Sequence, residues 1–118
     1  MSDWEYISLG ESGQWLSGGT PPADPLFWGG DIPWISAKSM YSTYVSQSID
    51  CVTEEGAKNG TRLVPPDTVL ILVRGMMLNR HVPIGITTRA VTFNQDIKAI
   101  IPNAGVNPRF LLYWLISM

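Results

Sequence analysis

The chain has few of the groups that carry protein chemistry. Its 118 residues include one cysteine, Cys51, and one histidine, His81, and only 15% of them are charged. A single cysteine excludes an intrachain disulfide and favours a reducing cytoplasm, in which Cys51 is a small buried apolar residue. No HxxxH, CxxC or HxE pattern accompanies His81, so a zinc or iron site is not expected. The N-terminus lacks the basic and apolar regions of a signal peptide, and no apolar run is long enough to span a membrane. We therefore expect a cytoplasmic protein without a membrane segment.

Enzyme signatures are missing as well. The sequence has no GxxxxGK(S/T) loop and no GxGxxG turn for a nucleotide, and no GxSxG elbow for a nucleophilic serine. We therefore expect no catalytic residue and no cofactor.

Acidic residues are scarce in the second half of the chain. Residues 1–67 carry nine acids and three bases, a net charge of −6, whereas residues 68–118 carry one acid and five bases, a net charge of +4. No acid lies between Asp67 and Asp96. Charge asymmetry of this kind indicates a polyanionic partner, although three arginines in a short window also arise by chance.

The remaining patterns predict a small β-rich domain. The length fits one domain over 1–118, and 45% apolar residues can bury one core. Val69–Val73 is a β-branched-rich run that is typical of a buried central strand. Further strands are expected at 4–9, 84–88, 90–93 and 98–101, the last of them stopped by Pro102. We predict an α+β fold with a twisted, mostly antiparallel sheet, short helices and an apolar C-terminal helix.

Two helices have recognisable ends. Thr53 is an N-cap followed by two glutamates, which the helix dipole favours in the first turn, and Gly60 ends that short helix. Asn107 caps a second helix, which Pro108 begins and which continues over 109–118.

This second helix is too apolar to stand in water. It must pack on the sheet or on something outside the chain. We expect a partner or a second copy of the chain to cover four of its side chains: Leu111, Leu112, Trp114 and Leu115.

Residues 27–35 contain two tryptophans, a double glycine and a proline. Gly29 and Gly30 supply a tight turn, and Pro33 suits only an edge strand or the start of a strand. We expect Trp28 and Trp34 to be largely buried in the core; the alternative is that they stack on bases.

Several segments, in order, resemble the specificity subunits of type I restriction-modification enzymes. The SGGTP loop at 17–21 and the WGGDIPWI run at 28–35 are the most specific, because both match the family's pattern without a change. In Pro65–Arg74, Asp67 stands where glycine is usual. The other matching segments are the opening strand Trp4–Gly10, the helix Thr53–Asn59 and the run Asn94–Pro102.

The resemblance implies a target recognition domain that reads double-stranded DNA and is not itself an enzyme. Methylation and cleavage would then belong to partner methyltransferase and restriction subunits. A complete subunit of this family has two such domains separated by long helices. We therefore expect residues 1–118 to form one domain, without the helical spacer and the second domain.

Base reading and phosphate binding define the candidate residues. Arginine reads guanine through two hydrogen bonds, asparagine and glutamine read adenine in the same way, and lysine holds phosphates. We predict that the acid-free segment 68–95 provides the main DNA-facing surface, with Arg74, Arg80 and His81 near its centre. The full set of candidates is Lys38, Arg74, Asn79, Arg80, His81, Arg89, Asn94 and Gln95.

Each candidate also has a structural interpretation. Arg74 could pair with a buried carboxylate, Asn79–His81 could be a solvated loop tip, and Asn94 and Gln95 could satisfy backbone groups in a turn. His81 taken alone is more often structural.

Two other functions compete with DNA reading. Five tryptophans in a small β-rich domain could form a carbohydrate-binding module. The chain could also be an assembly fragment whose final helix docks a methyltransferase or a second copy.

Overall fold

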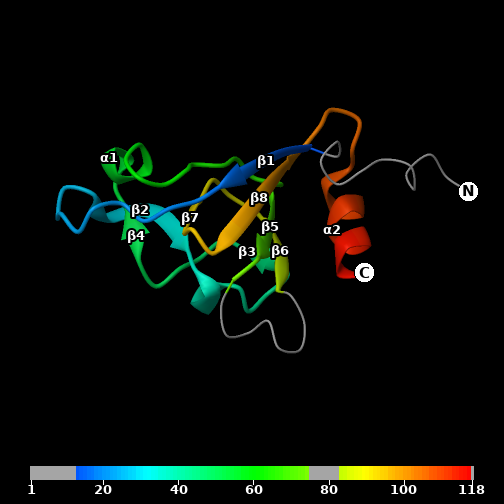
Figure 1. Ribbon diagram of the computed structural model, residues 1–118, viewed down its shortest axis with the longest axis horizontal. Helices are drawn as coiled ribbons and strands as arrows, with labels where there is room; N and C mark the ends of the chain where they lie inside the picture. The colour runs from blue at the N-terminus through cyan, green and yellow to red at the C-terminus, as the bar shows by residue number, and fades with distance from the viewer. Residues whose placement is uncertain (1–12, 75–82, 118) are drawn as a thin grey trace, which may run out of the picture.

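The computed structural model describes residues 13–74 and 83–117, which form two sheets and three short helical segments (Figure 1). The five-stranded sheet has the order β1 (Gly13–Ser17), β8 (Ile97–Pro102), β5 (Val69–Leu72), β6 (Ile84–Thr87), β3 (Tyr44–Val45). The three-stranded sheet has the order β4 (Cys51–Val52), β2 (Trp28–Ile35), β7 (Thr92–Phe93). The helical segments are the 3₁₀ turn η3 (Ala37–Ser39), α1 (Glu54–Ala57) and α2 (Pro108–Ile116).

Most strand pairs in both sheets are antiparallel. The two parallel pairs are β3 with β6 and β2 with β7. The predicted α+β fold with a mostly antiparallel sheet and an apolar helix near the C-terminus is confirmed. The strand expected at Trp4–Leu9 lies outside the described residues.

The central strand β5 has two buried faces, which explains its unbroken apolar run. Leu70 and Leu72 point into one cluster, together with Ile35 of β2 and Phe93 of β7. Val69 and Ile71, which alternate with them along the strand, pack in a second cluster on the side of α2. A strand that is covered on both faces needs apolar residues at every position. The predicted central strand is therefore confirmed, but it ends at Leu72, and Val73 is exposed.

Helix α2 covers one face of the five-stranded sheet. Its N-cap is Asn107, whose side chain accepts hydrogen bonds from the backbone N–H groups of Arg109 and Phe110, with Pro108 in the first turn. Leu111, Leu112 and Leu115 are buried against Val69, Ile86 and Ile100. The expectation that a partner must cover these three leucines is wrong, because the chain's own sheet covers them. The exposed apolar side chains of α2 are Phe110, Tyr113 and Ile116.

The three-stranded sheet lies at the opposite end of the molecule from α2, as Figure 1 shows. Its middle strand is β2, so the expectation that Pro33 lies on an edge strand is wrong. A proline fits there because the neighbouring strands are short: β7 pairs only with Trp34 and Ile35, beyond Pro33.

The double glycine of β2 is a bulge in the strand and not the predicted turn. The pairing with β4 shifts register between Trp28 and Ile32, and Gly29 has a φ of 87°. A left-handed φ of this kind carries a steric cost for residues with a Cβ, which glycine avoids.

The tryptophans of β2 are half-buried, which is less than predicted. The rings of Trp28 and Trp34 pack edge to face, with centroids 5.1 Å apart and planes at 85°. Two perpendicular rings do not form the flat platform that a sugar-binding module would need.

The turns follow the sequence signals closely. Thr53 caps α1 by accepting a hydrogen bond from the backbone of Gly56 at 3.1 Å. Gly60, with a φ of 84°, follows the end of α1 by three residues. Asp67 has a φ of 64°, which explains why glycine is usual at this place in similar sequences.

Two smaller expectations need correction. Cys51 is half-buried and not fully buried, because it lies in β4 at the edge of the small sheet. Pro102 does not stop β8 but pairs with Gly13 as its last residue. Within the described ranges, no helix is long and apolar enough to cross a membrane.

Candidate nucleic-acid interface

The turn Asn94–Asp96 joins β7 to β8 and is fixed from the inside by Asn94. The Asn94 side chain is buried, and its Oδ1 accepts a hydrogen bond from the backbone N–H of Asp96 at 3.0 Å. The backbone N–H of Asn94 donates to the carbonyl oxygen of Ile35, at the end of β2, at 2.9 Å. The alternative that Asn94 satisfies backbone groups in a turn is therefore confirmed.

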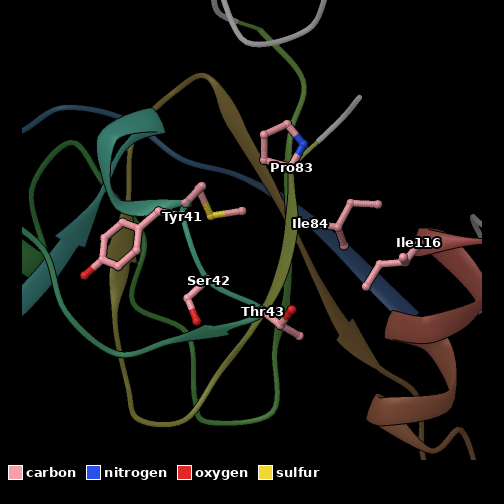
Figure 2. A pocket seen from close by; sticks show the side chains of 7 residues that line it. Tyr41, Ser42, Thr43, Pro83, Ile84 and Ile116 are labelled. Carbon is pink, nitrogen blue, oxygen red and sulfur yellow. The ribbon is translucent and has the colours of Figure 1, made fainter. Parts of the chain in front are cut away.

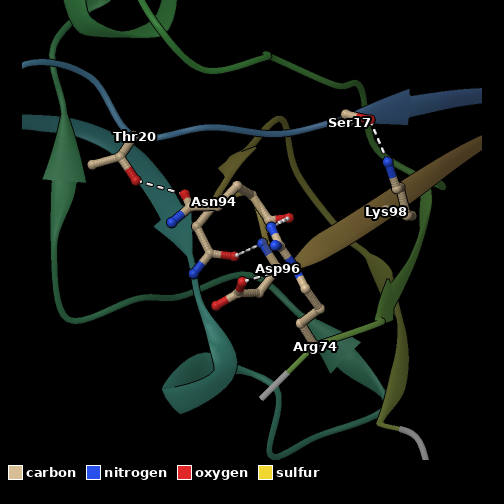
Figure 3. A network of polar contacts seen from close by, with 7 residues as sticks. Ser17, Thr20, Arg74, Asn94, Asp96 and Lys98 are labelled. Atoms are coloured by element: carbon tan, nitrogen blue, oxygen red, sulfur yellow. Dashed lines mark hydrogen bonds and ion pairs between the residues drawn. The ribbon is translucent and has the colours of Figure 1, made fainter.

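Arg74 leaves β5 and lies against this turn. Its Nη2 donates a hydrogen bond to the carbonyl oxygen of Gln95 at 3.0 Å, and its Nε lies 3.4 Å from a carboxylate oxygen of Asp96 (Figure 3). The Arg74 side chain is 64% exposed and that of Asp96 is 35% exposed. Arg74 thus has an acidic partner, as one interpretation expected, but the partner is at the surface and not buried.

Gln95 connects the same turn to the SGGTP loop. Its side-chain Oε1 accepts a hydrogen bond from the Thr20 hydroxyl at 2.7 Å, across a sequence separation of 75 residues. The backbone N–H of Gly19 donates to the carbonyl oxygen of Phe93 at 3.0 Å. A Cβ on Gly18 would collide with the carbonyl oxygens of Phe93 and Asn94, so only glycine fits. We call Gly18–Thr20 together with Asn94–Asp96 the motif hub.

The tryptophans of β2 hold the loop of the motif hub from the other side. The indole N–H of Trp34 donates to the carbonyl oxygen of Gly19 at 3.0 Å. The indole N–H of Trp28 donates to the carbonyl oxygen of Pro22 at 2.9 Å. The SGGTP loop, the tryptophans of β2 and the run that begins at Asn94 therefore meet in space, and most of the side-chain hydrogen bonds described for them go to backbone. This makes them largely scaffold.

Two lysines lie close to the motif hub in the fold. The Lys98 ammonium group on β8 donates a hydrogen bond to the Ser17 hydroxyl on the neighbouring strand β1, beside the hub (Figure 3). Lys38 is exposed on η3, which begins two residues after Ile35, the hydrogen-bond partner of Asn94. Lys98 was not among the sequence candidates, since a lysine that begins a predicted strand gives no sign of which face it occupies.

The structure separates Arg89 from this group. Its Nη2 donates to the carbonyl oxygen of Asp31, near the bulge of β2, at 3.1 Å, whereas the motif hub adjoins the other end of that strand. Asn79, Arg80 and His81 lie outside the described residues. The structure thus brings together Arg74, Asn94 and Gln95, with Lys38 close to them in the fold.

The acid-free segment 68–95 is not one continuous surface. Most of its described residues are buried, in the strands β5, β6 and β7 or next to them in the chain. Its exposed described residues are Val73 and Arg74, Thr88 to Ala90, and Gln95. The predicted DNA-facing surface can therefore include only these exposed residues and residues outside the described ranges.

A second exposed polar group joins α2 to β3. A hydrogen bond from Tyr113, and then one from Arg109, lowers the pKa of the Tyr44 phenol below its ordinary value. The same Tyr44–Tyr113 bond raises the pKa of Tyr113. Arg109 adds a positive charge to this face of the molecule, away from the motif hub.

A surface hollow of about 250 Å³ lies between residues 40–43, the start of β6 and the end of α2 (Figure 2). Figure 2 shows Ile84 of β6 and Ile116 of α2 facing each other on one side of it and Tyr41 on the other. Its lining is made of apolar groups and hydroxyls, without a carboxylate or an amine that could transfer a proton at neutral pH. Across residues 13–74 and 83–117, no three acidic, cysteine or histidine side chains gather in a way that could hold a metal ion.

A family model covers the chain from end to end. The model of the type I restriction modification DNA specificity domain matches residues 1–118. The chain belongs to this family. It is 38% identical over 114 residues to the specificity subunit of a type I restriction enzyme of Escherichia coli, a match that covers 94% of this chain and 28% of that subunit. It is 32% identical over 120 residues to the MjaIX specificity subunit of Methanocaldococcus jannaschii, covering 94% of this chain and 26% of that subunit.

Solved structures share the fold of this specificity domain. The HsdS subunit of Thermoanaerobacter tengcongensis superposes with a TM-score of 0.69 at 19% identity, over 92% of this chain and 26% of that one. A chain from a structural study of complex assembly and conformational transition in a type I restriction-modification system gives the same TM-score at 21% identity, over the same shares of the two chains. At these identities the likeness shows a common fold. The chain spans about a quarter of the length of these relatives.

Proposed function

We propose that this specificity domain recognises a target sequence in double-stranded DNA for a type I restriction-modification enzyme. The observation that carries the proposal is the family match over residues 1–118, in which the SGGTP loop and the run that begins at Asn94 meet in the motif hub and Trp34 of the WGGDIPWI run bonds to it. The hub presents the Gln95 amide at the surface, and Arg74, which lies against the hub, presents an arginine fork, with Lys98 close by. These are the side chains that read base edges and hold phosphates.

The chemistry of the whole enzyme would lie elsewhere in the complex. We infer that methyltransferase and restriction subunits carry out methylation and cleavage, and that residues 1–118 act as one recognition domain without a catalytic residue or a cofactor. The chain's relatives are themselves named as specificity subunits of type I restriction enzymes.

The roles within the interface follow from side-chain chemistry. Lys38 and Lys98 would hold phosphates as point charges, whereas Arg74 and Gln95 would approach base edges. Arg89, which lies apart from the hub, would contact the backbone of the duplex farther along. Asn79, Arg80 and His81 follow Arg74 closely in the chain and remain candidates for the same groove.

A duplex titration at two salt concentrations tests the proposal. The wild-type chain should bind with a dissociation constant of about 10⁻⁴ to 10⁻⁶ M on non-specific DNA near physiological salt. The affinity should fall as salt rises, because each phosphate contact releases a counterion. Lys98→Gln should reduce the salt slope by about one, and Arg80→Ala should do the same if Arg80 touches phosphate.

Lys58→Gln is the matched control, because Lys58 is an exposed lysine beside α1 and is not a candidate. Its salt slope should equal that of the wild type. Absence of salt-dependent binding by the wild-type chain would contradict the proposal.

The outer face of α2 supports a second candidate function, a contact in assembly. Phe110 is 51% exposed and Tyr113 is 54% exposed on a helix whose other side is buried in the sheet. Aromatic residues of this kind are enriched in protein interfaces. If this face forms an interface between copies, Phe110→Ser should lower the mass measured by light scattering at high concentration. A wild-type chain that is already monomeric would exclude self-association through this face.

A further inference from the structure

Arg74 is held in one orientation by groups of a single turn. Two of the five N–H donors of a guanidinium are engaged: Nε faces the Asp96 carboxylate at 3.4 Å, and one Nη2 donor goes to the Gln95 carbonyl at 3.0 Å. Both contacts lie on the Nε side of the group. The outer edge, made of Nη1 and the second Nη2 donor, makes no hydrogen bond or ion pair with the described residues.

The turn that holds Arg74 is itself fixed. Backbone N–H groups of Val73 and Arg74 both donate to the Asp96 carbonyl, at 2.8 and 3.2 Å. The buried Asn94 side chain holds the backbone of Asp96. A side chain that is already oriented loses less entropy when it binds than one that must be ordered at that moment.

The Asp96 carboxylate contributes little to the stability of the fold. An exposed arginine–carboxylate pair contributes little to the free energy of unfolding, because water and salt screen it. The carboxylate also cancels the charge of Arg74, which weakens its attraction to phosphate. It leaves intact the two parallel donors of the outer edge, which match a pair of acceptors such as guanine O6 and N7.

We propose that Arg74 determines the specificity of this domain at one position of its target by reading a guanine, and that Asp96 and the Gln95 carbonyl are its positioning groups. This inference rests on the proposed DNA-recognition function and names the base that one residue reads. The same donor pair also fits two oxygens of a phosphate, and the experiment separates these two sources of the same chemistry.

The test starts from a randomised duplex library selected with the wild-type chain, followed by titrations of the preferred duplex and of duplexes changed at each position. Arg74→Lys keeps the charge but loses the planar pair of donors. The preference for guanine at one position should fall by about 5- to 150-fold, while the salt slope stays unchanged. A phosphate contact would instead leave the preference at every position intact, and this result would overturn the inference.

Asp96 is tested by two substitutions that differ in the acceptor. Asp96→Ala removes the acceptor for Nε, so the guanine preference should fall at the position that Arg74→Lys affects, while the affinity for changed duplexes does not decrease. Asp96→Asn keeps an acceptor oxygen and should retain more of the preference. A uniform loss of affinity across all duplexes would mean that Asp96 only supports the fold, and would overturn its positioning role.

Arg62→Lys is the control for exchanging a surface arginine, because Arg62 is exposed and is not a candidate for DNA contact. It should leave every preference unchanged. A lost preference for a base other than guanine would overturn the inference and leave the proposed function standing, whereas wild-type binding without preference at any position would overturn the inference and sequence recognition together. Absence of duplex binding would overturn both.

Discussion

The two layers that cover the five-stranded sheet are attached in different ways. On one face, α2 is attached through an apolar cluster formed by Leu111, Leu112, Leu115 and residues of the sheet strands. On the other face, β2 also packs through an apolar cluster that includes Ile35, but the SGGTP loop is attached through hydrogen bonds to backbone carbonyls and through glycines that admit close backbone contact.

This difference explains where the sequence resemblance is strongest. An apolar interface accepts many side chains of similar volume, so it leaves a weak signature. A backbone contact at Gly18 accepts one residue type, because any Cβ would strike the carbonyl oxygens of Phe93 and Asn94. Recognisable motifs in this domain therefore mark close backbone packing rather than the residues that read DNA.

The largest expected effect comes from breaking the apolar layer. Leu112 is fully buried, so Leu112→Ala should lower the free energy of unfolding by about 2–5 kcal/mol. Urea denaturation followed by tryptophan fluorescence measures the change. Ile116→Ala on the exposed side of the same helix is the control and should cost less than about 1 kcal/mol. Equal costs would show that the inner face of α2 is not packed as described.

The hydrogen-bonded layer is broken most directly at Gly18. Gly18→Ala should cost about 1–3 kcal/mol, because the added methyl group forces backbone to move. The indole N–H resonance of Trp34 should also shift, since that group donates to the neighbouring Gly19 carbonyl. Gly105→Ala is the matched control: Gly105 has a φ of 90° but no atom near its added Cβ, so it should leave the Trp34 resonance in place. An unshifted resonance in Gly18→Ala would contradict the described contact.

A glycine substitution at Asp67 should raise the free energy of unfolding, whereas the substitutions at Leu112 and Gly18 should lower it. The φ of 64° at Asp67 costs an aspartate more than it costs glycine. Asp67→Gly should therefore raise the free energy of unfolding by up to about 1 kcal/mol. Asp67→Ala keeps the strained conformation and should not raise it. A gain with alanine equal to that with glycine would mean that backbone strain is not the cause.

The smallest effect concerns the contact between α2 and β3 outside the apolar cluster. Hydrogen bonding from Tyr113 lowers the pKa of Tyr44, because it favours the phenolate. In Tyr113→Phe the pKa of Tyr44 should rise towards its ordinary value, and an ultraviolet absorbance titration should show the loss of the lower-pKa tyrosine. A titration of the Tyr44 phenol that does not move would mean that the two phenols are not bonded in solution. Both rings are exposed, so no measurable change in stability is expected.

The fold was predictable where local signals decide the structure. The caps at Thr53 and Asn107 involve only a few neighbouring residues, and the unbroken apolar run of β5 requires only that both faces of the strand be covered. The edge strand predicted at Pro33 and the turn predicted at the double glycine were wrong, because the structure at both places depends on which strands pair with β2. The short partners β4 and β7 come from distant parts of the chain.

The candidate site was predictable only in part. Residue chemistry selected Arg74 and Gln95, and the family resemblance selected the run that begins at Asn94. Sequence reasoning missed Asp96, since nothing local indicates that a carboxylate at the start of β8 meets an arginine at the end of β5. It also missed Lys98 and its bond to Ser17, which depends on the pairing of β1 with β8.

The strand order has a consequence for how fast the domain folds. β1 pairs with β8 rather than with a neighbour in sequence, and β2 pairs in parallel with β7, so both sheets close only after long stretches of chain have been ordered. The chain loses the entropy of closing such loops before the distant contacts form and stabilise the fold. Non-local β topologies therefore fold on timescales of roughly milliseconds to seconds. During that interval the apolar strand Val69–Leu72 is uncovered on both faces. We therefore expect refolding yield, measured after dilution from urea, to fall with protein concentration more steeply than equilibrium stability alone would indicate.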